Sequence, residues 1–587
     1  MLFCTRLPVL AVLSLMLVPL VWAEDKPADK KPVDPRRALL EKAGYIAVPM
    51  TNDTEGLGFL VPAEIDKRKL ALDLDTGAAT SLDLAVAKEM KLQLGPARPH
   101  YGLAGDGVAY LAEVPNFKLG TYELFDDLQQ LPFEVFDRKS KKSSSSGIFG
   151  RNMMEPWGMV IDYPTGNLYL RSPIKAAMPK LAGVWKEKRR TENGVERKAD
   201  EKNSLTWEFA DERLKVTING TTTVHRIMLA PDGDAYSSCF FDEKDIKKSG
   251  EVTAKFAGVF KTAGNKLTAC LRLDFGKVQE IPQVFKAGKD SGLSLIEFEH
   301  SDPEFSKKKS IDPLREALLK DNYIAVPMEQ DANTQRVVSA RLGKEQVRLI
   351  VDTGCTAITL DKKLAAKLGA KEQSTLDLRT LTGVAQGKQI ELKSMTVGKY
   401  DTRSSWNMMQ GVSIDLTGMN AKLKEIKVAP VDGLLGHLDL LNGSAIIDFH
   451  TDTLYLKAAH ERLQPLLSGI WVGMTAELDG MKGPLDSRRE SVQFKGDRIY
   501  ITRNGITIEY RYHVQDMGDY LRFGAFPPKA DPLADGFKYT EQWVFRVNDD
   551  DLQFLVVADP TKYKEGEVKF AAPKNSGLYL ANFKRAK

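Results

Sequence analysis

Short apolar runs separated by turn residues recur along most of the chain, and they predict a fold made mainly of β-strands. The strand-like runs ALDLD and LIVD end at Asp75 and Asp352, and a helical pattern follows each, LDLAVAKEMKL and LDKKLAAKLGA. Other regions, such as SVQFKGDRIYITRNGITIEYRYHV, alternate apolar and polar residues between Gly-Asp and Asn-Gly turns. Regularly spaced strands of this kind are typical of an antiparallel sheet or a closed barrel.

The pattern repeats itself. YIAVPM begins at Tyr45 and again at Tyr323, and the Asp-Thr-Gly that starts at Asp75 recurs at Asp352. GIFGRNMMEPWGMVIDYPTGNLYL parallels GLLGHLDLLNGSAIIDFHTDTLYL, LAGVWK parallels LSGIWV, and DSGLSLIEF parallels NSGLYLANF. Two kinds of unit therefore occur twice each, which predicts an A-B-A-B duplication.

This duplication defines the predicted domains, since 587 residues are too many for one hydrophobic core. The joints between units are rich in Lys, Asp, Pro and Ser, as solvated linkers are. In chain order, the predicted segments are a signal peptide (1–23), a linker (24–38), the first A unit (39–173), the first B unit (174–299), a second linker (300–317), the second A unit (318–458) and the second B unit (459–587).

The first residues predict export. One Arg precedes an apolar run from Leu7 to Trp22, and Val21 and Ala23 stand where a signal peptidase requires small residues. An uncleaved membrane anchor is the alternative, but the run is shorter than the roughly 20 residues of a spanning helix and contains two prolines. We expect a bacterial-type signal peptide and a periplasmic or extracellular protein that has no membrane segment after cleavage.

Charge and rare residues argue against several functions. Lys and Arg number 83 against 79 Asp and Glu, so no overall field favours nucleic acid or an anionic membrane. The seven histidines form no His-Glu-x-x-His sequence and the chain has no Cys-x-x-Cys, so we expect neither a metal nor another cofactor. Cys239 and Cys270 could form a disulfide in an exported protein, and the sequence leaves their state open.

The two Asp-Thr-Gly sequences indicate chemistry, because a carboxylate at the end of a buried strand costs free energy unless it has partners. The glycine lets the chain turn where a side chain would clash. With the later sequences Ile148-Phe149-Gly150 and Leu434-Leu435-Gly436, both A units resemble the retropepsin-like aspartic protease domain, and IFGRNMM is close to its viral members. The expected fold is therefore mainly β, with two retropepsin-like lobes alternating with two small antiparallel β-barrel domains.

This resemblance implies that the two lobes build one site in which Asp75 and Asp352 are catalytic. Two carboxylates about 3 Å apart share a proton, so that one activates a water as general base and the other donates to the scissile carbonyl oxygen. It also implies that the threonines hold the lobes together and that the apolar-apolar-Gly segments pack behind the site. The implied supporting residues are Thr76, Gly77, Ala78, Ile148, Phe149, Gly150, Thr353, Gly354, Cys355, Leu434, Leu435 and Gly436.

Pairing of the two lobes within one chain is favoured by their effective concentration, and a homodimer is the alternative. The resemblance further implies a hairpin flap over the site in each lobe. The candidates are YGLAGDGVAYLAEV (101–114) and LRTLTGVAQGKQIEL (378–392). In either arrangement, the expected partner is a peptide or protein substrate.

Two residues beside the motifs depart from the family pattern. Asp73 lies on the strand face of Asp75, where an apolar residue is usual, so it could raise the pKa of the pair or indicate a less buried strand. Cys355 stands where Ala, Ser or Thr is usual and is a potential oxidation site. The first lobe is also one residue shorter just after its motif.

Three further polar residues have expected structural roles. Asp162 and Asp448 occupy matching positions in a late strand and are expected to support turns. His437 follows Gly436 and has no histidine counterpart in the first lobe, which carries Arg151 there, so we expect a solvated side chain.

The B units carry no catalytic constellation. Their opening Gly-x-Trp and closing SGLYL-type strand resemble small lipocalin-like barrels, in which Trp185 and Trp471 are expected to lie in the core. Two functions fit this organisation. The first is an exported aspartic endopeptidase, which the paired Asp-Thr-Gly sequences favour. The second is a non-catalytic binding protein built from degenerate protease lobes and ligand-binding barrels.

Overall fold

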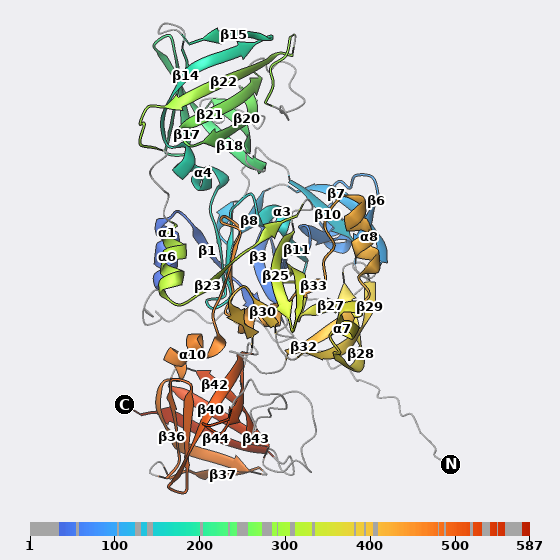
Figure 1. Cartoon of the computed structure of the whole chain (residues 1–587), viewed down its shortest axis with the longest axis vertical. Coiled ribbons are helices and arrows are strands. Elements are labelled where there is room, and N and C mark those ends of the chain that lie inside the picture. The colour runs from blue at the N-terminus through green and yellow to red at the C-terminus, as the bar shows by residue number, and fades with distance from the viewer. Residues whose placement is uncertain are drawn as a thin grey trace, which may run out of the picture.

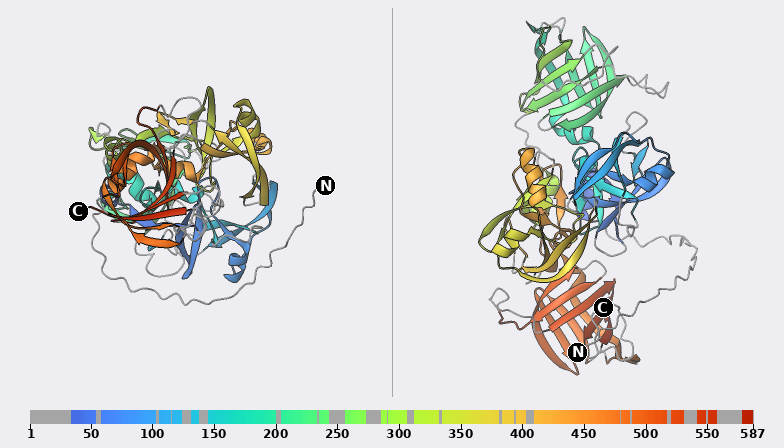
Figure 2. Two further views of the ribbon diagram at one scale, coloured as in Figure 1. Left: turned by 90° about the horizontal axis from the view of Figure 1, so that it is seen from below. Right: turned by 90° about the vertical axis from the view of Figure 1, so that its right-hand side faces the viewer.

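The computed structural model is elongated, with a closed β-barrel at each end of its longest axis and two sheet-rich lobes between them (Figure 1, Figure 2). The predicted signal peptide (1–23) lies outside the described residues. These are 34–53, 58–102, 105–114, 116–123, 131–137, 145–199, 204–232, 235–242, 256–272, 285–289, 291–305, 312–331, 335–380, 383–392, 395–402, 409–478, 480–486, 489–516, 520–530, 541–548, 550–557 and 578–586.

The first lobe is a ten-stranded sheet in the order β6-β7-β10-β5-β11-β4-β3-β8-β9, with β2 beside β3. The strand that ends at Asp75 lies between β3 and β11, so its carboxyl end opens at the centre of the sheet. The elements are β2 (Thr51–Asn52), β3 (Phe59–Ile65), β4 (Arg68–Asp75), β5 (Ser81–Asp83), α2 (Leu84–Glu89), β6 (Arg98–Gly102), β7 (Gly105–Val114), β8 (Phe117–Leu119), β9 (Tyr122–Glu123), β10 (Leu131–Phe136), β11 (Gly147–Gly150) and α3 (Arg151–Met154).

The second lobe has the same strand order, β28-β29-β32-β27-β33-β26-β25-β30-β31, with β24 beside β25. One addition is α8, which lies between β32 and β33 in the chain. The elements are β24 (Glu329–Gln330), β25 (Arg336–Leu342), β26 (Glu345–Val351), β27 (Thr359–Asp361), α7 (Lys362–Lys367), β28 (Lys371–Thr380), β29 (Gly383–Leu392), β30 (Met395–Val397), β31 (Tyr400–Asp401), β32 (Met409–Ile414), α8 (Thr417–Glu425), β33 (Gly433–Leu435) and α9 (His437–Asn442).

A six-stranded sheet joins the lobes, in the order β1-β13-β12-β34-β35-β23. Its two halves meet where β12 pairs antiparallel with β34, and Leu40, Tyr169, Leu318 and Tyr455 are buried in one apolar cluster beside it. The elements are α1 (Pro35–Lys42), β1 (Ile46–Pro49), β12 (Val160–Asp162), β13 (Asn167–Leu170), α6 (Pro313–Lys320), β23 (Ile324–Pro327), β34 (Ile446–Asp448) and β35 (Thr453–Leu456).

Helices α1 and α6 begin inside segments predicted as linkers. Asp34 accepts a hydrogen bond from Arg36 N (2.8 Å), and Asp312 accepts one from Leu314 N (3.0 Å), so each aspartate caps a helix whose first residue is proline. The two short helices then pack against each other (Figure 1). The charged composition of these segments predicted linkers and gave no sign of the helix caps, so the linkers are shorter than predicted.

Asp162 and Asp448 close turns at the joining sheet, as expected. Asp162 accepts from Thr165 N (3.2 Å), and Asp448 accepts from His450 N (2.8 Å) and from Thr451 Oγ1 (2.7 Å). Burial is the largest influence on both carboxyls and raises the pKa of each to about 6.

This burial predicts that acid strengthens the joining sheet. A carboxyl whose folded pKa is raised favours folding below its unfolded pKa and loses that contribution as pH rises through about 6. We expect Asp448→Asn to reduce the fall in melting temperature between pH 5 and pH 7, by removing a penalty of at most about 3 kcal/mol. Calorimetry of the variant beside Asp321→Asn, which removes an exposed carboxylate nearby, checks this. Equal pH dependence in the wild type and Asp448→Asn would contradict it.

Each end of the molecule is a barrel of eight strands, closed by the β14–β22 and β36–β44 pairings, and in each a ninth strand (β15 or β37) pairs with β14 or β36 outside the closed ring. The first is made of α4 (Pro173–Leu181), β14 (Gly183–Glu192), β15 (Val195–Lys198), β16 (Thr206–Ala210), β17 (Arg213–Ile218), β18 (Thr221–Asp232), β19 (Ala235–Asp242), β20 (Phe256–Ala263), β21 (Lys266–Arg272) and β22 (Leu293–His300). The second is made of α10 (Ala459–Leu467), β36 (Gly469–Leu478), β37 (Met481–Pro484), β38 (Ser491–Lys495), β39 (Arg498–Arg503), β40 (Ile506–Asp516), β41 (Leu521–Phe526), β42 (Glu541–Asn548), β43 (Asp551–Val557) and β44 (Leu578–Arg585).

Aromatic side chains fill the interiors of both barrels. Trp185 and Trp471 are completely buried, as expected, and their indole N–H groups donate to Leu181 O (2.7 Å) and Leu467 O (2.9 Å) of the preceding helices. Trp207 and Trp543 lie in the same two apolar clusters. Over the described residues, these interiors are packed cores.

Cys239 and Cys270 are free thiols on β19 and β21, which are separated by β20. Among the residues described, no helix is long and apolar enough to cross a membrane.

Candidate active site

Thr76 and Thr353 connect the two lobes through four hydrogen bonds. Thr76 N donates to Thr353 Oγ1 and Thr353 N donates to Thr76 Oγ1, each at 3.0 Å. Each hydroxyl donates to the carbonyl oxygen two residues before the opposite threonine, Thr76 to Val351 O (2.7 Å) and Thr353 to Leu74 O (2.9 Å). Both threonines are buried. These four hydrogen bonds place the ends of β4 and β26 side by side.

The hydrogen bonds of Thr76 and Thr353 bring the carboxyls of Asp75 and Asp352 into hydrogen-bond contact. Asp75 Oδ1 accepts from Gly77 N (2.8 Å) and Ala78 N (3.0 Å), and Asp352 Oδ1 accepts from Gly354 N (3.0 Å). A Cβ on Gly77 would lie 2.7 Å from the Asp352 carboxyl, and one on Gly354 would lie 2.4 Å from that of Asp75. Only glycine fits at these two positions, because any side chain would collide with the opposite carboxyl.

The two carboxyls have different electrostatic surroundings. Burial raises the pKa of Asp352 well above its ordinary value, and the neighbouring charge of Asp75 raises it further. Burial also raises the pKa of Asp75, but hydrogen bonds from Asp352 and Gly77 and the charge of Arg151 oppose the rise. Adjacent carboxyls cannot both ionise cheaply, so one proton is shared across the pair. Both residues keep part of their surface accessible.

The apolar-apolar-Gly segments lie directly behind the aspartates. β11 runs parallel to β4 with Gly150 beside Asp75, and β33 runs parallel to β26 with Leu435 beside Val351. The four apolar side chains of these segments, Ile148, Phe149, Leu434 and Leu435, are at most 3% exposed. Gly150 and Gly436 press against the loops after the motifs, where a Cβ would lie 2.4 Å from Ala79 C and 2.6 Å from Ala357 C. Every supporting residue predicted from the sequence therefore lies at this centre.

Cys355 is a shielded thiol. Its Sγ donates to Ala357 O (3.2 Å) and lies 3.2 Å from Thr359 Oγ1. Burial, with the Asp352 charge, raises the pKa of Cys355 to about 12.

This environment predicts a thiol that resists modification, because the thiolate is the reactive form. In the folded protein we expect iodoacetamide to label Cys355 at least about 100-fold more slowly than in urea. Peptide mapping separates its label from those on Cys239 and Cys270. Labelling of Cys355 at the same rate in the folded and unfolded chain would contradict the burial described here.

Asp73 has its own partner. Ser145 Oγ donates to Asp73 Oδ2 at 2.5 Å, and Asp73 stands beside Ile148 in the sheet. In the second lobe the corresponding strand position is Ile350, which is buried in an apolar cluster with Leu423 of α8. The extra carboxylate thus occupies a polar strand face in the first lobe that α8 covers in the second.

His437 is buried, and the expectation of a solvated side chain was wrong. It is 2% exposed, and its ring meets Phe59 edge-on at 5.1 Å and lies 5.3 Å from Tyr163. The backbone N–H of His437 donates to Cys355 O at 2.6 Å. The packing partners belong to the other half of the molecule, so the local sequence around Gly436 gave no sign of them.

Two residues near the aspartates were missed. Arg151 follows Gly150, and its guanidinium donates to Gly77 O. Asp439 in α9 accepts from the backbone of Gly436 and Ile358, and burial raises its pKa to about 7. The Arg151 signal was present in IFGRNMM, whereas Asp439 has no matching acid in the first lobe, where Asn152 accepts from Thr80 N (2.7 Å).

Both flap candidates form hairpins. β6 pairs antiparallel with β7 up to Gly102 and Gly105, and β28 pairs with β29 up to Thr380 and Gly383. The tips between these residues lie outside the described residues.

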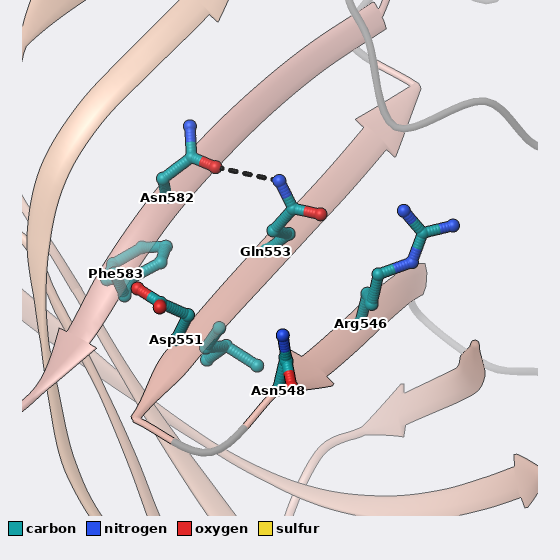
Figure 3. Close-up of a pocket in the computed structure, with 7 residues that line it drawn as sticks. Arg546, Asn548, Asp551, Gln553, Asn582 and Phe583 are labelled. Atoms are coloured by element: carbon teal, nitrogen blue, oxygen red, sulfur yellow. Dashed lines mark hydrogen bonds between the residues drawn. The ribbon is translucent and has the colours of Figure 1, made fainter. Parts of the chain in front are cut away.

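A pocket of about 360 Å³ lies elsewhere, on strands β42 to β44 of the second barrel (Figure 3). Gln553 Nε2 donates to Asn582 Oδ1 there (3.1 Å), and Asp551 pairs with Lys584 (2.7 Å). Its lining brings together no nucleophile with a base. The residues around it are Arg546, Asn548, Asp551, Leu552, Gln553, Asn582 and Phe583.

One family and two solved structures are similar to parts of this chain. Residues 338–437, which include Asp352, match the aspartyl protease family. An aspartic proteinase from Irpex lacteus shows 10% identity over 70% of this chain and 97% of its own, with a TM-score of 0.30. A retropepsin-like aspartic protease from Rickettsia conorii shows 23% identity over 23% of this chain and 89% of its own, with a TM-score of 0.16. No curated protein matches. Residues 338–437 of the second lobe are thus similar to the aspartyl protease family.

Proposed function

We propose that the protein is an aspartic endopeptidase whose single site combines Asp75 and Asp352. The observation that carries this proposal is the hydrogen-bonded pair of carboxyls, each at the end of a strand from a different lobe. With one proton between them, one carboxylate takes a proton from water while the other carboxyl donates to the peptide carbonyl oxygen. Water attacks the carbonyl carbon as these two protons move. The tetrahedral intermediate collapses when the carboxyl that took the water proton gives it to the departing amine, and the other carboxyl takes its own proton back from the hydroxyl that becomes the product's carbonyl group.

The active unit in this proposal is one chain. The four threonine hydrogen bonds and the β12–β34 pairing both connect the two halves of the same molecule. A homodimer in which each lobe meets its own copy would have to give up these contacts. The two hairpins, β6–β7 and β28–β29, would close over a bound peptide and exclude water.

The wider organisation is part of the same proposal. The identical strand orders of the two lobes, and of the two barrels, support an A-B-A-B duplication. The barrels, lipocalin-like in outline but filled with aromatic side chains, would act as spacers or docking modules. The apolar amino-terminal run supports export to the periplasm or the medium.

The test is direct. The purified chain without residues 1–23 is incubated with a denatured protein mixture from pH 3 to pH 7, and new termini are identified by mass spectrometry. We expect cleavage that a hydroxyl-containing peptide analogue of the tetrahedral intermediate inhibits. If no new termini form at any pH, the peptidase proposal fails and the non-catalytic binding protein takes its place.

A further inference from the structure

The two halves of the site differ at the residue that follows the apolar-apolar-Gly segment. In the first lobe this residue is Arg151, whose backbone N–H donates to Ala78 O (2.9 Å) and whose guanidinium donates to Gly77 O. In the second lobe it is His437, whose ring packs against Phe59 and Tyr163. The two lobes therefore place a guanidinium beside the loop of Asp75 and an imidazole at the matching position of the second lobe.

Arg151 is linked to Asp75 through one residue. Its guanidinium holds the Gly77 carbonyl, and the Gly77 N–H donates to Asp75 Oδ1 at 2.8 Å. Gln335 of the second lobe donates to the same carbonyl at 3.4 Å. The loop that carries Asp75 is thus fixed from its own lobe and from the opposite one.

The charged groups around Arg151 come from both lobes. Asp75 interacts with it most strongly, ahead of Asp331 and Asp352, and Glu134 on β10 follows. Burial lowers the pKa of Arg151, while these four acids oppose the change. The ordinary pKa of an arginine side chain is so high that Arg151 stays protonated. A partly buried cation of this kind requires an anion nearby.

The surroundings of Asp352 are different. Asp352 also interacts with Arg151, but less strongly than Asp75 does. Its other titratable neighbours, Tyr163 and Cys355, are both held neutral because burial raises their pKa values. A proton is therefore retained more easily on Asp352 than on Asp75.

Resting on the proposed function, we propose that Arg151 is the positioning residue that gives the two aspartates separate roles. Its guanidinium keeps the negative charge on Asp75, which becomes the general base toward water, and leaves the shared proton on Asp352, which donates to the carbonyl oxygen. The atoms balance, since the proton that Asp75 takes from water replaces the one that Asp352 gives to the substrate.

The first test uses the pH dependence of kcat/KM for Arg151→Gln and Arg151→Lys. Loss of the cation is expected to move the acidic limb, which reports ionisation of the base, upward by about one pH unit. Arg151→Lys retains the charge and is expected to keep the limb within a few tenths of a unit. The matched control is Arg68→Gln at the other end of β4, about 23 Å from Asp75 along the strand. Equal limbs in wild type and Arg151→Gln, or equal shifts in both Arg151 variants, would overturn the proposal.

A second test does not depend on activity. If Asp75 carries the charge and Asp352 the proton, Asp352→Asn replaces one neutral group with another and should leave the melting temperature of the lobes nearly unchanged. Asp75→Asn removes the anion beside Arg151 and should lower it by several degrees. The opposite order, or equal losses, would overturn the assignment. A wild type that cleaves nothing would defeat the proposed function, whereas this comparison would still decide the charge assignment.

Discussion

Asparagine in place of either Asp75 or Asp352 is expected to lower the rate of peptide cleavage at least about 1000-fold. Each substitution keeps the size of the side chain and removes one of the two carboxyls that share the proton. The remaining carboxyl then lacks the partner that performs the other proton transfer. The two losses should be similar in size, and the double variant should lose little more, because both residues belong to one unit. Initial rates on a fluorogenic peptide taken from an identified cleavage site measure this.

The matched control for this prediction is Asp73→Asn. Asp73 lies on β4 two residues before Asp75 and is engaged by Ser145, so its replacement should leave most of the activity. Loss of activity in Asp73→Asn equal to that in Asp75→Asn would show that the general acidity of this strand, rather than the hydrogen-bonded pair, matters.

Thr76→Val is expected to destabilise the two-lobed body by about 2 to 4 kcal/mol. Valine has the shape of threonine but neither donates to Val351 O nor accepts from Thr353 N, and each buried partner left without a hydrogen bond costs about 1 to 3 kcal/mol. The carboxyls of Asp75 and Asp352 would also be held less accurately against each other, and we expect kcat to fall about 100-fold. Thr76→Ser keeps the hydroxyl and should stay close to wild type on both measures.

Calorimetry suits this measurement, because intrinsic fluorescence mixes the lobes with the barrels: Trp157 is buried in the core of the lobes, whereas Trp185, Trp207, Trp471 and Trp543 lie in the barrels. The lobe transition should move down in Thr76→Val and remain in place in Thr76→Ser. Equal melting of the two variants would contradict the role given to the hydroxyl.

Much of the site could be predicted because its signals are local. An apolar run that ends in Asp-Thr-Gly specifies a buried strand, a carboxylate and a close-approach glycine within a few residues. Repetition of that run then predicted the partner of Asp75. The helices α2 and α7 and the strands of the barrels follow from equally local periodicity.

Other features depend on residues that are distant in the sequence. His437 is buried because Phe59 and Tyr163 come from the other half of the molecule, and α1 and α6 are supported by packing against each other. Arg151 gains its importance only when the Gly77 carbonyl is placed against its guanidinium. The packed interior of each barrel likewise depends on which faces of eight strands meet, and alternation alone does not distinguish a filled barrel from a hollow one.

The central claim is that Asp75 and Asp352 of the same chain form one peptidase site. It is tested most directly by assaying Asp75→Asn and Asp352→Asn alone and after the two chains are unfolded and refolded together. The claim predicts that all three samples are inactive while wild type treated in the same way cleaves peptide. Recovery of about a quarter of the activity in the mixture would show that Asp75 of one chain meets Asp352 of another. Retention of a large share by each single variant would show that each lobe pairs with its own copy, and either result would contradict the claim.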